Sequence, residues 1–151
     1  MAKIEIIRFA STSVETVNVG GLILTTHCAF RKNENGRKQI YFTHDEALAF
    51  EEEMKHFGFR LPTMTEMMQF AVVKASPAGK DILHSDKKGY ISARTGKLVH
   101  PNVARFWLSD VENSEDAESI SDDGRNPRLI RTPRNYRLTV RFVYDESLLK
   151  R

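Results

Sequence analysis

The order of the secondary-structure patterns predicts an α+β fold with an antiparallel sheet. Strand patterns occupy residues 3–9, 14–19 and 22–24, two helix patterns follow within residues 43–74, and a strand pattern covers residues 136–144. Strands grouped at both ends of a chain, with adjacent helices between them, do not build the alternating βαβ units of a parallel sheet. We therefore expect two helices packed on a small twisted antiparallel sheet, with a long loop region.

The composition indicates a single domain over residues 1–151. The chain is 40% hydrophobic and 28% charged, as in ordinary soluble proteins. Its first residues lead directly into a strand pattern, so we expect no signal peptide, and no apolar run approaches the ~20 residues that span a bilayer. Cys28 is the single cysteine, which excludes an intrachain disulfide and favours a reducing compartment.

A hairpin and a first helix are expected after the N-terminal strands. Asn35-Gly36 is a strong two-residue turn signal, and residues 39–42 return as a strand. Thr43 and Glu46 have capping-box spacing, which starts a helix at this point. The apolar face of that helix is Ala47, Phe50, Met54 and Phe57, and its expected solvent face is Glu51, Glu52, Glu53 and Lys55.

A sharp corner is predicted between the two helices. Gly58 can take the positive φ that ends a helix, and Pro62 restricts its own φ and the conformation of the residue before it. Thr63 and Glu66 form a second capping box. The second helix is expected from about residue 64 to residue 74, where the sequence is apolar nearly all round and predicts burial on more than one side.

The second half of the chain combines a loop-rich region with a clear final strand. Residues 76–105 carry several glycines, with short strands expected at residues 82–84 and 89–91, and an apolar element follows at residues 106–108. An acidic stretch between Arg105 and Arg125 is expected as a solvated loop with a turn at residues 123–124, followed by six arginines up to Arg141. Residues 136–144 alternate, with even-numbered positions apolar.

Three segments together resemble the Fibrobacter succinogenes major paralogous domain family. Residues 58–66 are similar to its GWRLPT-x-x-E signature, residues 89–98 with 106–109 to its GYR-x-x-x-TG-x-L and YWSS pieces, and residues 140–145 to its VRCVRD strand. The resemblance covers roughly residues 18–146. It departs from the family at Phe59, Leu108 and Phe142, where the family has Trp, Ser and Cys.

The resemblance implies a C-type-lectin-like fold, which also houses the formylglycine-generating enzymes. The matched residues are expected to be fold determinants, with Arg60 either paired to Glu66 or bonded to helix-end carbonyls, Trp107 as a core anchor and Arg141 paired to a carboxylate. These structural motif residues are Gly58, Arg60, Pro62, Thr63, Glu66, Trp107 and Arg141.

We expect no enzymatic activity and no cofactor. The formylglycine-generating enzymes need reactive cysteines near the C-terminus, and here only Cys28 is present. The chain contains neither the G-x-S-x-G nor the H-E-x-x-H motif, and its five histidines show no metal-ligand spacing. Direct binding of nucleic acid is also not expected, because arginines at every third position of an extended chain alternate between its faces.

The leading prediction is a phage virion structural or accessory protein, located in the virion. The resemblance suggests this class, because bare lectin-like domains of this kind are often virion components. We expect the protein to dock on other virion proteins, or on itself, through a loop face formed by residues 76–135. No membrane association is expected. The candidate binding residues are Tyr90, Arg94, Asp110, Glu112, Arg128 and Arg131.

The alternative is a ligand-binding module for a host glycan or a surface receptor, which binds its ligand with or without the help of calcium. Lectins of this fold use a Trp-Asn-Asp piece, for which the nearest match is residues 107–110, with Glu112 and Asn113 close by. Calcium takes six to eight oxygens, of which an acidic loop can supply several. A loop whose carboxylates only meet solvent is the simpler interpretation, so no metal ligand is assigned.

Overall fold

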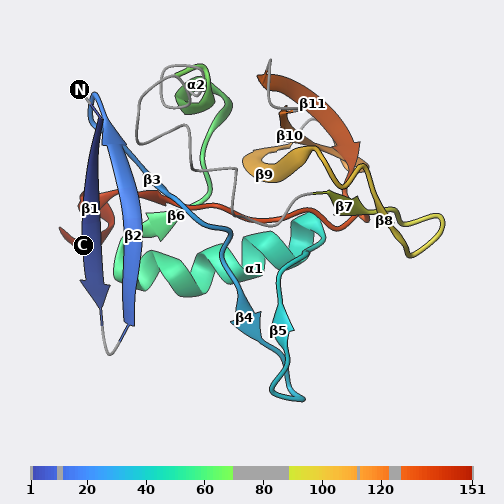
Figure 1. The fold of residues 1–151 in the computed structure, drawn as a ribbon, viewed down its shortest axis with the longest axis horizontal. Coiled ribbons are helices and arrows are strands. Elements are labelled where there is room, and N and C mark those ends of the chain that lie inside the picture. Colours follow the sequence, from blue (N-terminus) through green and yellow to red (C-terminus); the bar gives the residue numbers. More distant parts are fainter. Residues whose placement is uncertain (1, 10–11, 70–88, 112, 123–126, 151) are drawn as a thin grey trace.

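The computed structural model describes residues 2–9, 12–69, 89–111, 113–122 and 127–150 (Figure 1). Within them the fold is a mixed α+β arrangement of mostly antiparallel strands with one main helix. The main helix runs along one side of the molecule from the larger sheet toward a second, three-stranded sheet (Figure 1). The expected strand at residues 82–84 and the expected turn at residues 123–124 lie outside the described residues.

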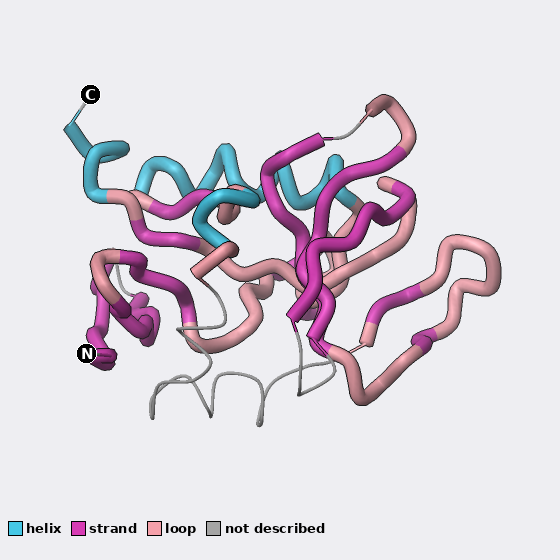
Figure 2. Tube along the Cα trace, turned by 90° about the horizontal axis from the view of Figure 1, so that it is seen from above, coloured by secondary structure: helices cyan, strands magenta, loops and turns pink. Residues whose placement is uncertain are grey.

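The larger sheet joins the two ends of the chain. Its strands are β1 (Ala2–Phe9), β2 (Thr12–Val19), β3 (Leu22–Thr25), β12 (Val143–Tyr144) and β6 (Phe59–Arg60), in that order. All four pairings are antiparallel. The predicted pairing of N- and C-terminal strands is therefore confirmed, and both chain ends lie on the same side of the molecule (Figures 1 and 2).

The smaller sheet corrects the prediction of an acidic loop. It consists of β9 (Ala104–Val111), β10 (Asp116–Asp122) and β11 (Pro127–Pro133), in the order β11-β10-β9. Glu118 and Asp122 are buried in β10. The prediction was wrong because it considered only the acidic residues of this stretch and not the apolar and small residues between them. Ala117 and Ile120 reach the core, and the Ser119 hydroxyl donates to the Ile130 carbonyl oxygen of β11. The loop face expected over residues 76–135 is therefore largely sheet where it is described.

Two short hairpins flank these sheets. The first pairs β4 (Arg31–Lys32) with β5 (Lys38–Gln39) and confirms the predicted hairpin, in which Gly36 has a φ of 75°. Its connection is longer than the expected two-residue turn, because Lys32 pairs with Lys38. The second pairs β7 (Tyr90–Ile91) with β8 (Leu98–Val99). Both hairpins project from the body of the molecule (Figure 1).

The main helix starts and ends where the sequence predicts. Helix α1 (His44–Met54) has the complete capping box of Thr43 and Glu46 and continues into a 3-10 turn, η1 (Lys55–Phe57). Gly58 ends this turn with a φ of 90°, and a Cβ at this position would lie 2.8 Å from the Tyr144 ring. Glycine is thus required both by backbone conformation and by close packing.

One residue of the expected solvent face of α1 is buried. Glu51 lies in the protein interior, where its Oε2 accepts a hydrogen bond of 2.7 Å from the Leu61 backbone N–H. The turn after η1 brings Leu61 back against the helix, so a carboxylate that periodicity assigns to solvent serves as a backbone acceptor instead.

The second predicted helix is wrong in its extent. Helix α2 spans only Met64–Met67, and the backbone N–H of Gln69 bonds to the Glu66 carbonyl in a tighter turn. Met67 is buried, but Met68 is 77% exposed, so the described part of the run lacks the expected burial on more than one side. Residues 70–74 of the predicted helix lie outside the described residues. The fold therefore has one main helix in its described part, where two were expected.

The final segment, residues 136–144, separates two hydrophobic clusters. Its even-numbered residues, from Tyr136 to Tyr144, pack in the cluster under α1, whereas Val143 packs in the cluster under β9 and β10. This confirms the predicted alternation. Only residues 143 and 144 belong to a strand, because the rest makes single bridges from Arg137, Leu138 and Thr139 to separate partners. Thr139 and Arg141 are buried as well, so the segment crosses the interior rather than covering it.

Among the described residues, no helix is both long and apolar enough to cross a membrane. The longest, α1, has 11 residues.

Candidate functional site

The corner between η1 and α2 is held by an ion-pair network. The Arg60 guanidinium donates to both carboxylate oxygens of Glu66, at 2.8 and 2.6 Å, and its Nε donates to Asp145 at 3.0 Å. Glu66 also accepts from the Thr63 backbone N–H as part of the predicted capping box. The predicted pairing of Arg60 with Glu66 is confirmed, and the network ties β6, α2 and the C-terminal segment together.

Both carboxylates of this network are held ionised. Burial disfavours the charged form of Glu66, but hydrogen bonds from Arg60 and from the Thr63 N–H outweigh it and lower the pKa of Glu66. Hydrogen bonds from Ser147 and Arg60 lower the pKa of Asp145. These three charges satisfy one another and hold the corner together.

Trp107 is the core anchor that the sequence predicts. Its ring is buried, and its Nε1 donates to the Phe42 carbonyl oxygen at 2.7 Å. The buried His44 ring packs edge-on against Trp107 at 5.0 Å, and its Nε2 donates to the Leu108 carbonyl oxygen at 2.9 Å. Burial lowers the pKa of His44, which keeps the imidazole neutral.

Arg141 is a fully buried arginine in the last segment. Its Nη1 donates to the Thr26 carbonyl oxygen at 2.9 Å, and its guanidinium lies 5.7 Å from the centre of the Phe106 ring. These contacts fix the chain after β3 against the last segment. The carboxylate partner expected from the sequence stays a prediction.

Three other arginines of the C-terminal half pair with separate acidic partners. Arg131 lies 3.8 Å from Glu118 of the neighbouring strand. Arg134 pairs with Asp45 in the first turn of α1, and Arg137 pairs with Glu46 in the same turn. The positive charge therefore does not form one stripe, which agrees with the prediction from spacing.

The predicted binding residues do not converge on one site. The Tyr90 ring stacks against His100 and Tyr136, and the Arg105 guanidinium lies 4.3 Å from its centre, so Tyr90 belongs to a packed aromatic group. Arg94 is exposed in the β7–β8 turn.

The remaining predicted binding residues belong to other elements. Arg128 and Arg131 are exposed on β11. Asp110 accepts a hydrogen bond of 2.8 Å from the Met64 backbone N–H and thereby caps α2. Glu112 lies outside the described residues.

The oxygens considered for calcium are used locally. Besides the capping role of Asp110, the Asn113 side-chain oxygen accepts from the backbone N–H groups of Glu115 and Asp116. In the part of the chain that the structure describes, no group of three or more His, Cys, Asp or Glu side chains is arranged to hold a metal ion. This geometry gives the calcium-assisted alternative no support.

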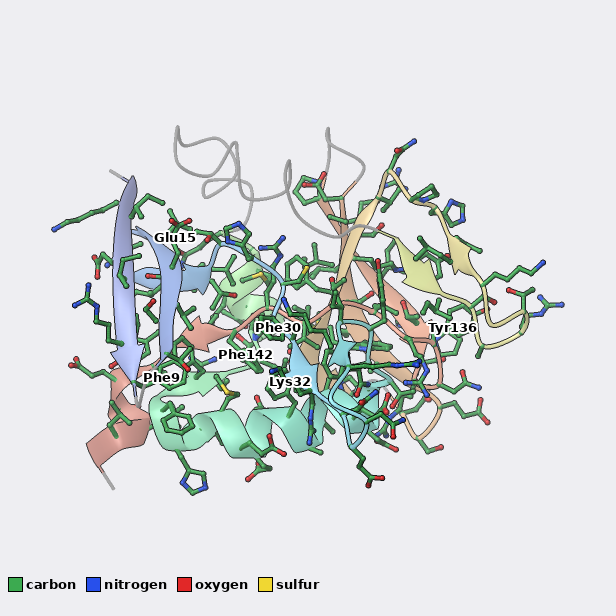
Figure 3. The ribbon with its side chains drawn as sticks, turned by 60° about the horizontal axis from the view of Figure 1, so that its bottom comes forward. Phe9, Glu15, Phe30, Lys32, Tyr136 and Phe142 are labelled. Atoms are coloured by element: carbon green, nitrogen blue, oxygen red, sulfur yellow. The ribbon has the colours of Figure 1, made fainter. Side chains whose placement is uncertain are left out.

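A cavity lies between the β1–β2 hairpin and α1, which sequence reasoning did not identify. Its volume is about 620 Å³. The walls include five of the nine phenylalanines in the sequence: Phe9, Phe30, Phe50, Phe59 and Phe142. They come from β1, the chain after β3, α1, β6 and the last segment, and Figure 3 labels three of them. No sequence signal links these positions, because they are up to 133 residues apart and come together only when the chain folds.

Strands β1 and β11 each form one outer edge of their sheets. Among the described residues, β1 pairs only with β2, and β11 pairs only with β10. Ile4 and Ile6 of β1 are 46% and 50% exposed, and Leu129 of β11 is 40% exposed. An edge strand offers unpaired backbone N–H and C=O groups to another chain, and apolar side chains beside them favour such pairing.

Comparisons of this chain with protein-family models, with curated proteins and with solved structures found no match.

Proposed function

We propose that the protein is a non-enzymatic structural or accessory protein of a phage virion, which docks on other virion proteins or on further copies of itself. The observation that carries the docking role is the edge strand β1. It is eight residues long, and Ile4 and Ile6, two positions apart on one face of the strand, are both exposed. The virion assignment rests on the sequence resemblance to stand-alone lectin-like domains.

The docking surface differs from the one expected from sequence. The candidate residues of the expected loop face are dispersed over separate elements, and two of them have structural roles. Strand β1 instead offers backbone groups for pairing, and Lys3, Glu5 and Arg8 can select a partner strand with complementary charges. Backbone pairing supplies affinity in this mode, and the alternating side chains supply specificity.

We also propose that the fold is a variant of the C-type-lectin-like fold. Three features support this assignment: the corner at residues 58–66 with its arginine and capping box, the buried Trp107, and the C-terminal strand inserted beside β3. An experimental structure tests it by superposition. A strand order that differs from that of lectin-like domains around the corner would contradict it.

Light scattering over a range of protein and salt concentrations tests the docking role. We expect a defined oligomer, or incorporation into particles when the virion proteins are present. The variant with Ile4→Lys and Ile6→Lys is expected to lose this association while keeping its melting temperature, because exposed positions contribute little to stability. Leu98→Lys, an equally exposed apolar position on β8 at the opposite end of the molecule (Figure 1), is the control. A strict monomer that also fails to enter particles would contradict the proposal.

A further inference from the structure

We infer that the cavity between the β1–β2 hairpin and α1 binds a small, neutral aromatic molecule that carries one N–H or O–H donor. This inference is distinct from the proposed docking role, because it concerns a small ligand and not a protein partner, although Ile6 of β1 belongs both to the exposed edge and to the cavity lining. It rests on the shape and lining of the cavity, on the arrangement of its aromatic rings, and on the polar groups at one end.

The floor of the cavity is a set of buried aromatic rings. Phe50, Phe59 and Phe142 are each at most 5% exposed. Phe50 and Phe142 meet edge to face, with ring centres 5.1 Å apart and an interplanar angle of 84°, and Phe59 and Phe142 are tilted at 6.4 Å. Aromatic rings prefer such edge-to-face and offset contacts, so a further ring can extend the cluster.

The mouth of the cavity is aromatic as well. Phe9 is half-buried and packs against Phe59 with ring centres 5.5 Å apart. Phe30 is 49% exposed, an unusual position for a phenylalanine, and the Lys38 ammonium lies 4.4 Å from its ring centre. The ammonium holds this ring through a cation–π contact, which orders the rim before any ligand arrives.

Polar groups line the outer part of the cavity on β2 and the following chain, where Glu15 and His27 are exposed. Glu15 belongs to the lining, and its Oε1 accepts a hydrogen bond of 2.8 Å from the Thr26 hydroxyl. The same hydroxyl lies 2.9 Å from the His27 Nδ1. A carboxylate is an acceptor with several lone pairs, so Glu15 retains capacity for a donor on a ligand. Figure 3 labels Glu15 together with Phe9, Phe30 and Phe142.

The size and the lining select the class of ligand. A volume of about 620 Å³ lies within the range of small-molecule sites. A charged ligand would lose its hydration among phenylalanine rings, which disfavours it. A neutral ring with one donor satisfies both the aromatic floor and the Glu15 carboxylate. Indole fits this description, and indene has nearly the same shape without the N–H donor.

Calorimetric titration of the protein with indole and with indene tests the inference. We expect indole to bind at least about fivefold more tightly than indene, because only indole donates to Glu15. Glu15→Ala should remove this preference, and Glu15→Gln should retain part of it through the amide oxygen. Equal affinities for the two compounds in the wild-type protein would overturn the inference.

A cavity-filling variant locates the binding. Val14 lines the cavity from β2, so Val14→Phe is expected to weaken indole binding at least about tenfold by occupying its space. Leu129→Phe, on the exposed edge of β11, is the matched control and should bind indole as the wild type does. Undiminished binding by a folded Val14→Phe protein would place the indole elsewhere and overturn the inference.

A third measurement needs no variant. Cys28 lines the cavity and is the only cysteine in the sequence, so a thiol reagent such as Ellman's reagent reports on this wall alone. Saturating indole is expected to slow the reaction of Cys28 at least about threefold, since a bound ring blocks the approach of the reagent. An unchanged rate in saturating indole would overturn the inference even if Val14→Phe failed to fold.

Discussion

Arg60 donates two parallel hydrogen bonds to Glu66, from Nη1 to Oε1 at 2.8 Å and from Nη2 to Oε2 at 2.6 Å. The residues are six positions apart, on either side of a proline corner. Bidentate pairs of this kind fix orientation as well as distance. Because Asp145 accepts from the Nε of the same arginine, one guanidinium orients the start of α2 and the chain after β12.

Replacement of Arg60 by alanine is expected to lower the free energy of unfolding by about 2 kcal/mol, since two partly buried carboxylates lose a charged donor. Urea denaturation measures the change. Arg94→Ala, on an exposed turn, should change it by less than about 0.5 kcal/mol and serves as the control. Equal stability of the Arg60→Ala protein and the wild type would show that the corner does not depend on this network.

Acid should weaken the protein through the same network. The folded-state pKa values of Glu66 and Asp145 lie below their ordinary values, so their contribution is complete above about pH 5 and is lost as the pH falls through the lowered values. The fall in unfolding free energy below about pH 5 should therefore be shallower in Arg60→Ala than in the wild type. Parallel pH profiles for the two proteins would contradict this assignment.

His44 is expected to make stability depend on pH near neutrality. Its folded-state pKa is lowered by burial, so the unfolded chain takes up a proton first as the pH falls. Stability should be complete above the ordinary histidine pKa and should decrease as the pH falls from about 7.5 to about 5.5. Melting temperatures at the two pH values measure this. His56→Gln, at an exposed position, should keep the slope, whereas His44→Gln should lose most of it.

Glu51 and Glu52 give a matched pair of neighbouring carboxylates on α1. Glu51→Ala removes the acceptor of the buried Leu61 N–H and is expected to cost about 1–3 kcal/mol. Glu52 is exposed and pairs with Lys55, so Glu52→Ala should cost at most about 0.5 kcal/mol. Chemical denaturation of both variants measures the two losses in unfolding free energy. Similar losses in the two variants would indicate that burial of Glu51 contributes nothing specific.

Trp107→Phe is expected to cost about 2–4 kcal/mol, because it removes buried volume and leaves the Phe42 carbonyl without its indole donor. The variant also abolishes the fluorescence of the single tryptophan, so circular dichroism is the suitable measurement. A loss below about 1 kcal/mol would mean that the site collapses around the smaller ring.

Features that depend on neighbouring residues were predictable from the sequence. Both capping boxes, the glycine with positive φ at position 58 and a hairpin around Asn35-Gly36 appear where their local patterns place them. The alternation of the last segment was also predictable. In each case the stabilising contacts join residues a few positions apart, or follow from the period of an extended backbone, so a short stretch of sequence contains the information.

Tertiary structure alone decided which polar residues are buried and where a cavity remains. Glu51 is buried because Leu61 returns to it, Asp110 caps a helix that starts 46 residues earlier, and β10 is a strand because two neighbours pair with it. The five phenylalanines meet around one cavity only once separate elements pack. Burial and packing depend on partners distant in sequence, whereas capping and turn formation do not, and this difference separates the two kinds of feature.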